Sequence, residues 1–198
     1  MDRPVIVLAL MLGLVGQALA GDLYTAAGEG NLATVERMLA DGVSVDTAGP
    51  NAETPLTAAA LAGRTEVAEM LLAHGAGVQA RNAGGFTPLH AAAYSGSVPI
   101  AVLLLEKGAV LEDAQNKAGA TPLLVAAEQN QVAVAELLIS RGASVSAPES
   151  HGYIPLTRAF WKGHVDVVRL LKQHGATCQP AEVLGGAASY QQCVAAGN

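Results

Sequence analysis

The sequence is poor in aromatic residues, in charge and in cysteine. Of its 198 residues, 4% are Phe, Trp or Tyr and 14% are charged, whereas 51% are hydrophobic. This balance excludes an intrinsically disordered chain, which needs low hydrophobicity and high net charge. Two cysteines are too few for a disulfide-rich scaffold or a zinc ribbon. Much of the apolar content is alanine, the best helix former, so we expect thin, closely packed helices instead of a thick aromatic core.

Basic residues are also in the minority. The chain has 11 Lys and Arg against 17 Asp and Glu, which gives a formal net charge of −6 at pH 7. Nucleic-acid-binding domains usually carry a basic face, so this balance argues against a nucleic-acid partner. The charge is also uneven, because residues 22–69 hold eight acids and two bases while residues 158–172 hold four bases. An acidic segment near one end of the chain and a basic segment near the other are typical of solvated caps. The alternative is that these charges steer a charged partner.

No catalytic constellation is recognisable. The sequence lacks a Gly-x-Ser-x-Gly nucleophile motif, a His pair with zinc-ligand spacing on a helix and a phosphate-cradling glycine loop. Its five histidines and its acidic residues are dispersed along the chain. We therefore expect no enzyme, no metal site and no cofactor.

The first 20 residues are typical of a cleaved secretory signal peptide. The segment 4–21 is uncharged, residues 5–15 form an apolar run, and residues 18–20 read Ala-Leu-Ala. A short apolar core followed by a small-x-small site favours cleavage, here between Ala20 and Gly21. The run is well short of the roughly 20 residues of a spanning helix, so we expect no stable membrane insertion after cleavage. An uncleaved anchor is the alternative.

The rest of the chain repeats with a period of 33 or 34 residues. Two sets of residues recur in parallel, with glycine at positions 42, 75, 108, 142 and 175 and leucine at positions 23, 56, 89, 123 and 156. The single extra residue falls between Gly108 and Leu123, so we expect it in a connecting segment. Periods of this length are typical of solenoids built from stacked supersecondary units.

Each unit predicts a pair of helices. In the second unit, Thr-Pro-Leu at residues 54–56 opens the first helix, because proline is tolerated at the first helical position. Gly63 ends this helix, and apolar residues at helical spacing mark a second helix that ends at Gly75. Pro99 aligns with the first turn of a second helix, where it is harmless. Asn130 replaces the mid-unit glycine of the fourth unit, and asparagine tolerates positive φ.

These units resemble the ankyrin repeat. The third unit carries Thr-Pro-Leu-His-x-Ala-Ala from Thr87, then Gly96, then Leu-Leu-Leu-x-x-Gly-Ala at residues 103–109. The opening recurs at residues 54–56, 121–123 and 154–156, and the ending at residues 71–76, 137–143 and 170–176. The resemblance implies an all-α fold, a solenoid of stacked helix pairs with short hairpin-like loops. It also implies that His90 bonds to the neighbouring loops.

The repeat divides the chain into three parts. We expect a signal peptide at 1–20, five ankyrin-like repeats within 21–176 and a C-terminal capping tail at 177–198. The repeats fall at about 21–52, 53–85, 86–119, 120–152 and 153–176. The first repeat lacks the Thr-Pro opening, so we expect it to be an N-terminal cap.

Both cysteines lie in the tail. Pro180 and a Gly-Gly pair separate two short apolar segments, which we interpret as a turn and a short helix folded over the last repeat. An oxidising compartment favours a structural disulfide between Cys178 and Cys193. The alternative is a redox-active pair, although catalytic pairs are usually two residues apart.

In the ankyrin family, partners usually contact the loop tips and the exposed faces of the inner helices. Alignment of the repeats predicts a partner-binding face made of Arg81, Phe86, Tyr94, Gln115, Lys117, Glu128, Gln129, Tyr153, Trp161 and Lys162. This face holds the only Trp of a chain poor in aromatics, and interface hot spots favour Trp, Tyr and Arg. The alternative is that Tyr94 and Trp161 merely fill gaps between repeats.

The resemblance implies a non-catalytic protein-binding or scaffold module, which we expect to be a monomer. Together with the signal peptide, it predicts a periplasmic protein that binds, stabilises or regulates an envelope protein. Two alternatives are a redox accessory protein acting through Cys178 and Cys193 and a secreted effector that binds a host protein.

Overall fold

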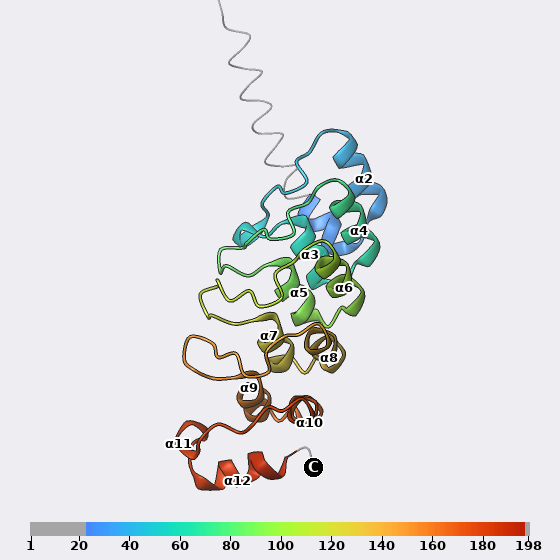
Figure 1. The fold of residues 1–198 in the computed structure, drawn as a ribbon. Helices are drawn as coiled ribbons and strands as arrows, with labels where there is room; N and C mark the ends of the chain where they lie inside the picture. The colour runs from blue at the N-terminus through green and yellow to red at the C-terminus, as the bar shows by residue number, and fades with distance from the viewer. Residues whose placement is uncertain (1–22, 197–198) are drawn as a thin grey trace, which may run out of the picture.

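The structure, a computed structural model, describes residues 23–196. The predicted signal peptide, 1–20, and its cleavage site between Ala20 and Gly21 lie outside the described residues. Within 23–196 every regular element is a helix, and successive helix pairs stack into an elongated solenoid (Figure 1). The predicted all-α solenoid is confirmed. No helix of this region has the length and apolar character needed to cross a membrane.

Each repeat consists of an inner helix, next to the projecting loops, and an outer helix behind it (Figure 1). The first pair is residues 23–29 with α2 (Leu32–Ala40). The pairs that follow are α3 (Pro55–Leu61) with α4 (Thr65–Ala73), α5 (Pro88–Ser95) with α6 (Val98–Glu106), α7 (Pro122–Glu128) with α8 (Val132–Ser140), and α9 (Pro155–Lys162) with α10 (Val165–Gln173). A 3-10 turn, η1 (Pro50–Ala52), lies in the first loop.

Threonine and proline start the inner helices. Thr54 Oγ1 accepts the N–H of Thr57 at 3.3 Å, and Thr121 Oγ1 accepts the N–H of Leu124 at 3.2 Å. Each bond satisfies one of the free N–H groups of a helix N-terminus. The proline that follows needs no such partner. The local sequence therefore sets where these helices begin.

The exceptional residues of the repeat lie where their backbone preferences allow. Asn130 takes the left-handed conformation with φ 59°, as Gly96 does in the repeat before it with φ 80°. Pro99 is in the first turn of α6. The connection between α6 and α7, residues 107–121, is one residue longer than the connections at 74–87 and 141–154. The three predictions about Asn130, Pro99 and the extra residue are confirmed.

Alanine and leucine form a continuous core through the stack. The leucine after each helix-opening proline is 0–1% exposed, and the inner helices pack through alanines such as Ala59, Ala92 and Ala126, all 0% exposed. Burying one such leucine contributes about 2 kcal/mol. Small side chains let α3, α5, α7 and α9 lie directly against one another. Two large side chains of the inner helices, Tyr94 and Trp161, lie outside this core and are exposed.

The tail covers the last repeat. Helices α11 (Ala181–Leu184) and α12 (Ala187–Ala195) lie across the end of the stack beside α9 and α10 (Figure 1). In the fifth repeat Ile154 replaces the capping threonine, and Gln179 of the tail bonds to two other donors at the start of α9. Gln179 Oε1 accepts the N–H of Ile154 at 3.3 Å and the hydroxyl of Thr157 at 2.6 Å. Its Nε2 donates to Gly152 O at 2.9 Å, so Gln179 stands in for the loop of a further repeat.

Candidate functional site

The loops form a row on one side of the stack and are tied to each other through the backbone. One hydrogen bond joins each loop to the next: Ala83 N–H to Asn51 O (2.7 Å), Lys117 N–H to Gly84 O (2.9 Å) and Ser150 N–H to Ala118 O (2.9 Å). Backbone bonds of this kind hold the loops at fixed spacing. The side chains on the loops therefore keep a defined position relative to the inner helices.

Arg81 fastens two of these loops together. Its Nη1 donates to Asp113 Oδ1 at 3.0 Å and to Gly85 O at 2.9 Å, and its Nη2 donates to Gln115 Oε1 at 3.3 Å. Burial opposes ionisation of Asp113, but Arg81 and the N–H of Gln115 outweigh it, so the pKa of this carboxyl lies below its ordinary value. Two residues of the predicted face, Arg81 and Gln115, are thus bonded to each other within the loops.

His90 links the third repeat to the fourth. Its Nε2 bonds to Ala120 O at 2.9 Å and Asp113 O at 3.1 Å, and Thr87 N–H donates to Nδ1 at 3.2 Å. Burial lowers the pKa of the imidazole, so it is neutral at pH 7. The expected bonds from His90 to the neighbouring loops are confirmed. The ring also meets the Phe86 ring edge-on at 5.4 Å.

A pocket of about 300 Å³ lies over the inner helices α3, α5 and α7. Its lining comes from three consecutive repeats: Glu53, Thr57, Leu61, Asn82, Phe86, Thr87, His90, Ala91, Tyr94, Val125, Glu128 and Gln129. The lining includes four residues of the predicted face, Phe86, Tyr94, Glu128 and Gln129. Tyr94 is 53% exposed and Leu61 37%, so two large side chains at this pocket face solvent.

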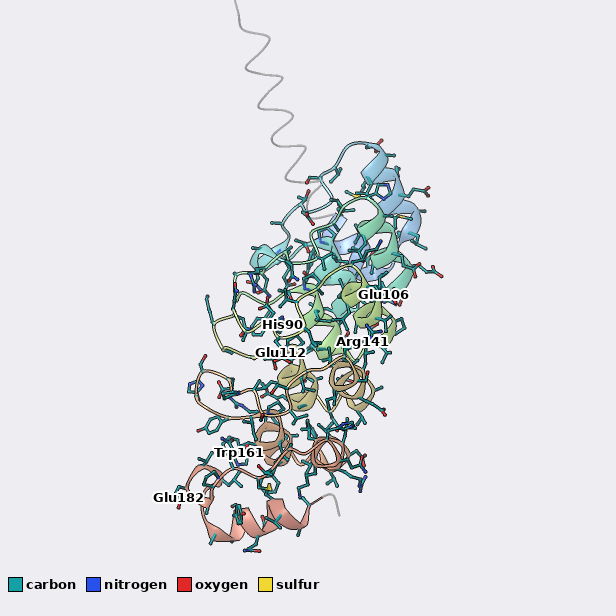
Figure 2. The ribbon with its side chains drawn as sticks, viewed as in Figure 1. His90, Glu106, Glu112, Arg141, Trp161 and Glu182 are labelled. Carbon is teal, nitrogen blue, oxygen red and sulfur yellow. A yellow bond between two sulfur atoms is a disulfide. The ribbon has the colours of Figure 1, made fainter. Side chains whose placement is uncertain are left out.

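A second cluster lies on the fifth repeat, around Trp161. The Tyr153 and Trp161 rings meet edge-on with centroids 4.7 Å apart, and Arg158 lies 5.1 Å from the centre of the Tyr153 ring. The His151 ring stacks on the Tyr153 ring, with centroids 6.3 Å apart. Trp161 is nonetheless 43% exposed. Figure 2 shows Trp161 on the loop side of the stack, whereas Arg141 lies with the outer helices.

A buried carboxylate supports this second cluster. Glu149 accepts a hydrogen bond from His151 Nδ1 at 2.9 Å and forms an ion pair with Arg158, whose Nη2 lies 3.4 Å from Glu149 Oε1. Burial raises the pKa of Glu149, but the bonds from His151 and Tyr153 and the charge of Arg158 outweigh it and lower the pKa overall. The buried Glu149 therefore holds His151 and Arg158 of this cluster in place through charge-assisted contacts.

Lys162 and Glu128 connect the two clusters. Lys162 Nζ lies 4.0 Å from Glu128 Oε1, and His164 Nε2 bonds to Glu128 O at 3.0 Å. Lys117, the remaining residue of the predicted face, has an exposed side chain on the loop row. The ten residues of that face thus lie in different places: on the bonded loops, in the pocket lining, in the Trp161 cluster, and in the Lys162–Glu128 ion pair between the pocket and that cluster. Their binding of a partner stays a prediction.

Several lining residues of the pocket lie outside the predicted face, among them the polar residues Glu53 and Asn82. Glu53 precedes the Thr-Pro opening, the same repeat position as Phe86 and Tyr153, so alignment of the repeats held the signal for it. Its Oε2 accepts the hydroxyl of Tyr24 at 2.7 Å, and Asn82 Nδ2 donates to Oε1 at 3.4 Å. Burial, together with Glu53, raises the pKa of Tyr24 to about 12. Asn82 had no sequence signal beyond its place in a loop.

The cysteines form part of the cap. The Cα atoms of Cys178 and Cys193 are 6.1 Å apart, a separation compatible with a disulfide, and Cys193 is completely buried. Beside them Lys172 Nζ donates to the carbonyls of Cys193 (2.6 Å), Val194 (2.8 Å) and Ala196 (2.6 Å). Burial lowers the pKa of Lys172. Cys193 is therefore poorly placed for thiol exchange, which requires access for the attacking thiolate, whereas Cys178 is half-buried.

No cluster of three His, Cys, Asp or Glu side chains that could hold a metal occurs between residues 23 and 196.

The family model described as "Ankyrin repeats (3 copies)" matches residues 23–113 and 109–181 of the chain. No curated protein matches the sequence. The family match covers most of the chain and coincides with the stack of helix pairs, the bonded row of loops and the pocket on the inner helices. The chain belongs to the ankyrin-repeat family.

Proposed function

We propose that this protein is a non-catalytic recognition module that binds a protein partner through its inner helices and loops. Ankyrin repeats suggest a protein-binding module. The observation that carries the proposal is the exposure of Tyr94 at a pocket on the inner helix α5 and of Trp161 in an aromatic cluster on the inner helix α9. Exposed aromatic side chains beside a concave surface are the features that interface hot spots share. We call this surface, Leu61 to Trp161 along the inner helices, the recognition face.

The distribution of aromatic residues supports binding over packing. Only 4% of the chain is aromatic, and the core between the inner helices is filled by alanine and leucine. Tyr94 and Trp161 remain 53% and 43% exposed, so about half of the surface of each residue is open to a partner. Covering apolar area stabilises a complex in proportion to the area removed from water. Truncating these residues should therefore weaken a complex much more than the fold.

We further propose that the protein works as a monomer outside the cytoplasm, in the periplasm, on an envelope protein that it binds, stabilises or regulates. The signal-like pattern of residues 1–20 supports export. The disulfide-compatible cysteines fit the oxidising compartment that export would supply. The net charge of −6 gives no support to a nucleic-acid partner. Burial of Cys193 favours a structural role for the pair over a redox activity.

A crosslinking pull-down from the cell envelope tests the recognition face. The baits are residues 21–198, the same chain with Tyr94→Ala and Trp161→Ala, and a control with Val110→Ala and Val165→Ala. The control side chains are 52% and 49% exposed but lie outside the predicted face. We expect one protein to be captured by the unchanged bait and the control and lost from the Tyr94/Trp161 variant, with thermal midpoints alike.

Two outcomes contradict the proposal. Equal capture by all three baits would mean that the recognition face does not bind the partner. A large fall in the thermal midpoint of the Tyr94/Trp161 variant without loss of capture would mean that these residues serve packing. Fractionation of cells that express the full chain tests the location. We expect a mature N-terminus at Gly21 in the periplasmic fraction, whereas the mature protein in the medium would favour a secreted effector.

A further inference from the structure

We propose that the pocket over α3, α5 and α7 takes up an arginine side chain of the protein partner. This inference rests on the proposed function, because it names the chemistry that the recognition face selects. Three features of the pocket support it: the negative charge of its lining, the weak neutralisation of that charge within the chain, and the apolar and aromatic side chains around it.

The lining is acidic. It contains two carboxylates, Glu53 and Glu128, and neither Lys nor Arg is among its residues. Glu53 precedes α3 and Glu128 ends α7, so the two carboxylates come from the elements on either side of α5. His90 also lines the pocket, but burial lowers its pKa and leaves it uncharged at pH 7. A cation that enters the pocket therefore meets two negative groups and no positive lining residue.

The negative charge is weakly compensated by the chain itself. Glu53 accepts from uncharged donors, the Tyr24 hydroxyl at 2.7 Å and the Asn82 amide at 3.4 Å. The ion pair of Glu128 is with Lys162, whose Nζ is 4.0 Å away and whose side chain is 56% exposed. An ion pair that is so exposed and so long contributes little stabilisation. A partner's cation at hydrogen-bond distance would form the stronger, charge-assisted bond.

The walls suit a cation that carries an apolar stem. Leu61, Ala91 and Val125 offer apolar contact to methylene groups, and the rings of Phe86 and Tyr94 lie beside them. A guanidinium attracts aromatic faces and is less strongly hydrated than an ammonium, so arginine fits these walls better than lysine. A volume of about 300 Å³ is at the small end of ligand pockets, which favours one side chain over a larger group.

The acidic excess of the first two repeats, which include Glu53, agrees with a basic partner segment. Residues 22–69, which include Glu53 and α3, hold eight acidic residues against Arg37 and Arg64. An excess of one sign around a concave site raises the local concentration of the opposite charge and speeds association. The partner is thus expected to present its arginine within a basic segment.

A peptide titration followed by NMR tests the pocket chemistry. The probes are acetyl-Gly-Arg-Gly-amide, its lysine counterpart and its citrulline counterpart, which keeps the shape of arginine without the charge. We expect the arginine peptide to shift the signals of Tyr94 and Val125 and to bind about tenfold more tightly than the citrulline peptide. Added salt should weaken it.

Substitution of the two pocket carboxylates tests whether they cause the preference for arginine. Glu53→Gln with Glu128→Gln removes both charges while keeping acceptor atoms, and we expect it to abolish the preference for arginine over citrulline. Glu136→Gln is the matched control, because Glu136 is an exposed carboxylate on the outer helix α8. This control should bind all three peptides as the unchanged protein does, and the thermal midpoints of all proteins should agree.

Equal affinity for the arginine and citrulline peptides would overturn the inference, as would unchanged binding by the Glu53/Glu128 variant. A lysine peptide that binds more tightly than the arginine peptide would overturn the choice of arginine. The pull-down separates the two proposals. A partner lost from the Tyr94/Trp161 bait but kept by the Glu53/Glu128 variant leaves the recognition face standing and refutes the arginine pocket alone.

Discussion

Reducing the bond predicted between Cys178 and Cys193 should release the tail and leave the repeats intact. The two residues are 15 apart in sequence, and closing a loop of that length stabilises the folded chain by about 3 kcal/mol in the entropic model. In a repeat array each unit packs only on its neighbours, so this loss should be felt at the end of the stack. Helix α12 and the last repeat are the affected elements.

Hydrogen exchange measures this loss directly. A change of about 3 kcal/mol corresponds to about a 100-fold rise in the opening equilibrium, since each 1.4 kcal/mol is a factor of ten. Amide exchange in α12 should accelerate by about that factor on reduction, while α5 and α6 keep their protection. A Cys178→Ser/Cys193→Ser variant should behave like the reduced protein without any reductant, which separates loss of the bond from side effects of the reagent.

Three results would refute this reasoning. Two free thiols, detected by mass spectrometry of the non-reduced mature protein, would show that the disulfide does not form. Unchanged exchange in α12 after reduction would mean that the bonds of Lys172 and Gln179 hold the tail without the disulfide. An equal rise of exchange in α5 and α12 would mean that the array unfolds as one unit and that the local argument is wrong.

Two further predictions concern the link between the third and fourth repeats. The folded-state pKa of His90 lies below its ordinary 6.5, so its stabilisation is fully present above about pH 6.5 and is lost as the pH falls from there through the folded-state pKa. Thermal melts at pH 7 and pH 5 should therefore show a fall in midpoint that is smaller in His90→Gln, and an equal fall in both proteins would exclude His90 as the cause. Arg81→Ala strands the Asp113 carboxylate, whose side chain is 2% exposed, and should cost about 3 kcal/mol in urea unfolding. The double change Arg81→Met/Asp113→Leu should cost less, because it leaves no buried charge unpaired, and a larger cost for the double change would contradict this reading.

Much of the fold was predictable because its signals are local. Thr54 and Thr121 cap their helices, Pro99 lies in a first turn, and Asn130 takes a left-handed conformation, each as its own backbone preference requires. A unit that packs only on its neighbours repeats the same local solution along the chain. Alignment of the repeats also placed Tyr94 at an exposed position of an inner helix.

The site was only partly predictable, because its members come from different repeats. Arg81 was a loop-tip candidate for partner contact, yet the fold commits its guanidinium to Asp113, 32 residues away. Glu53 was not considered, although it lines the same pocket as Tyr94 and Glu128. Repeat alignment shows which positions are equivalent, but it does not show which side chains meet across two or three units.

The sequence by itself determined the repeat, the helix ends and the row of positions that face away from the core. These features depend on backbone preferences and on periodicity, which act within a few residues. The tertiary structure alone decided how those positions are used: Arg81 in a loop bond, Glu53 and Glu128 around one pocket, and Gln179 as the substitute for a further repeat. The reason is physical, since ion pairs, pockets and caps are set by distances between side chains that lie 20 or more residues apart in the chain.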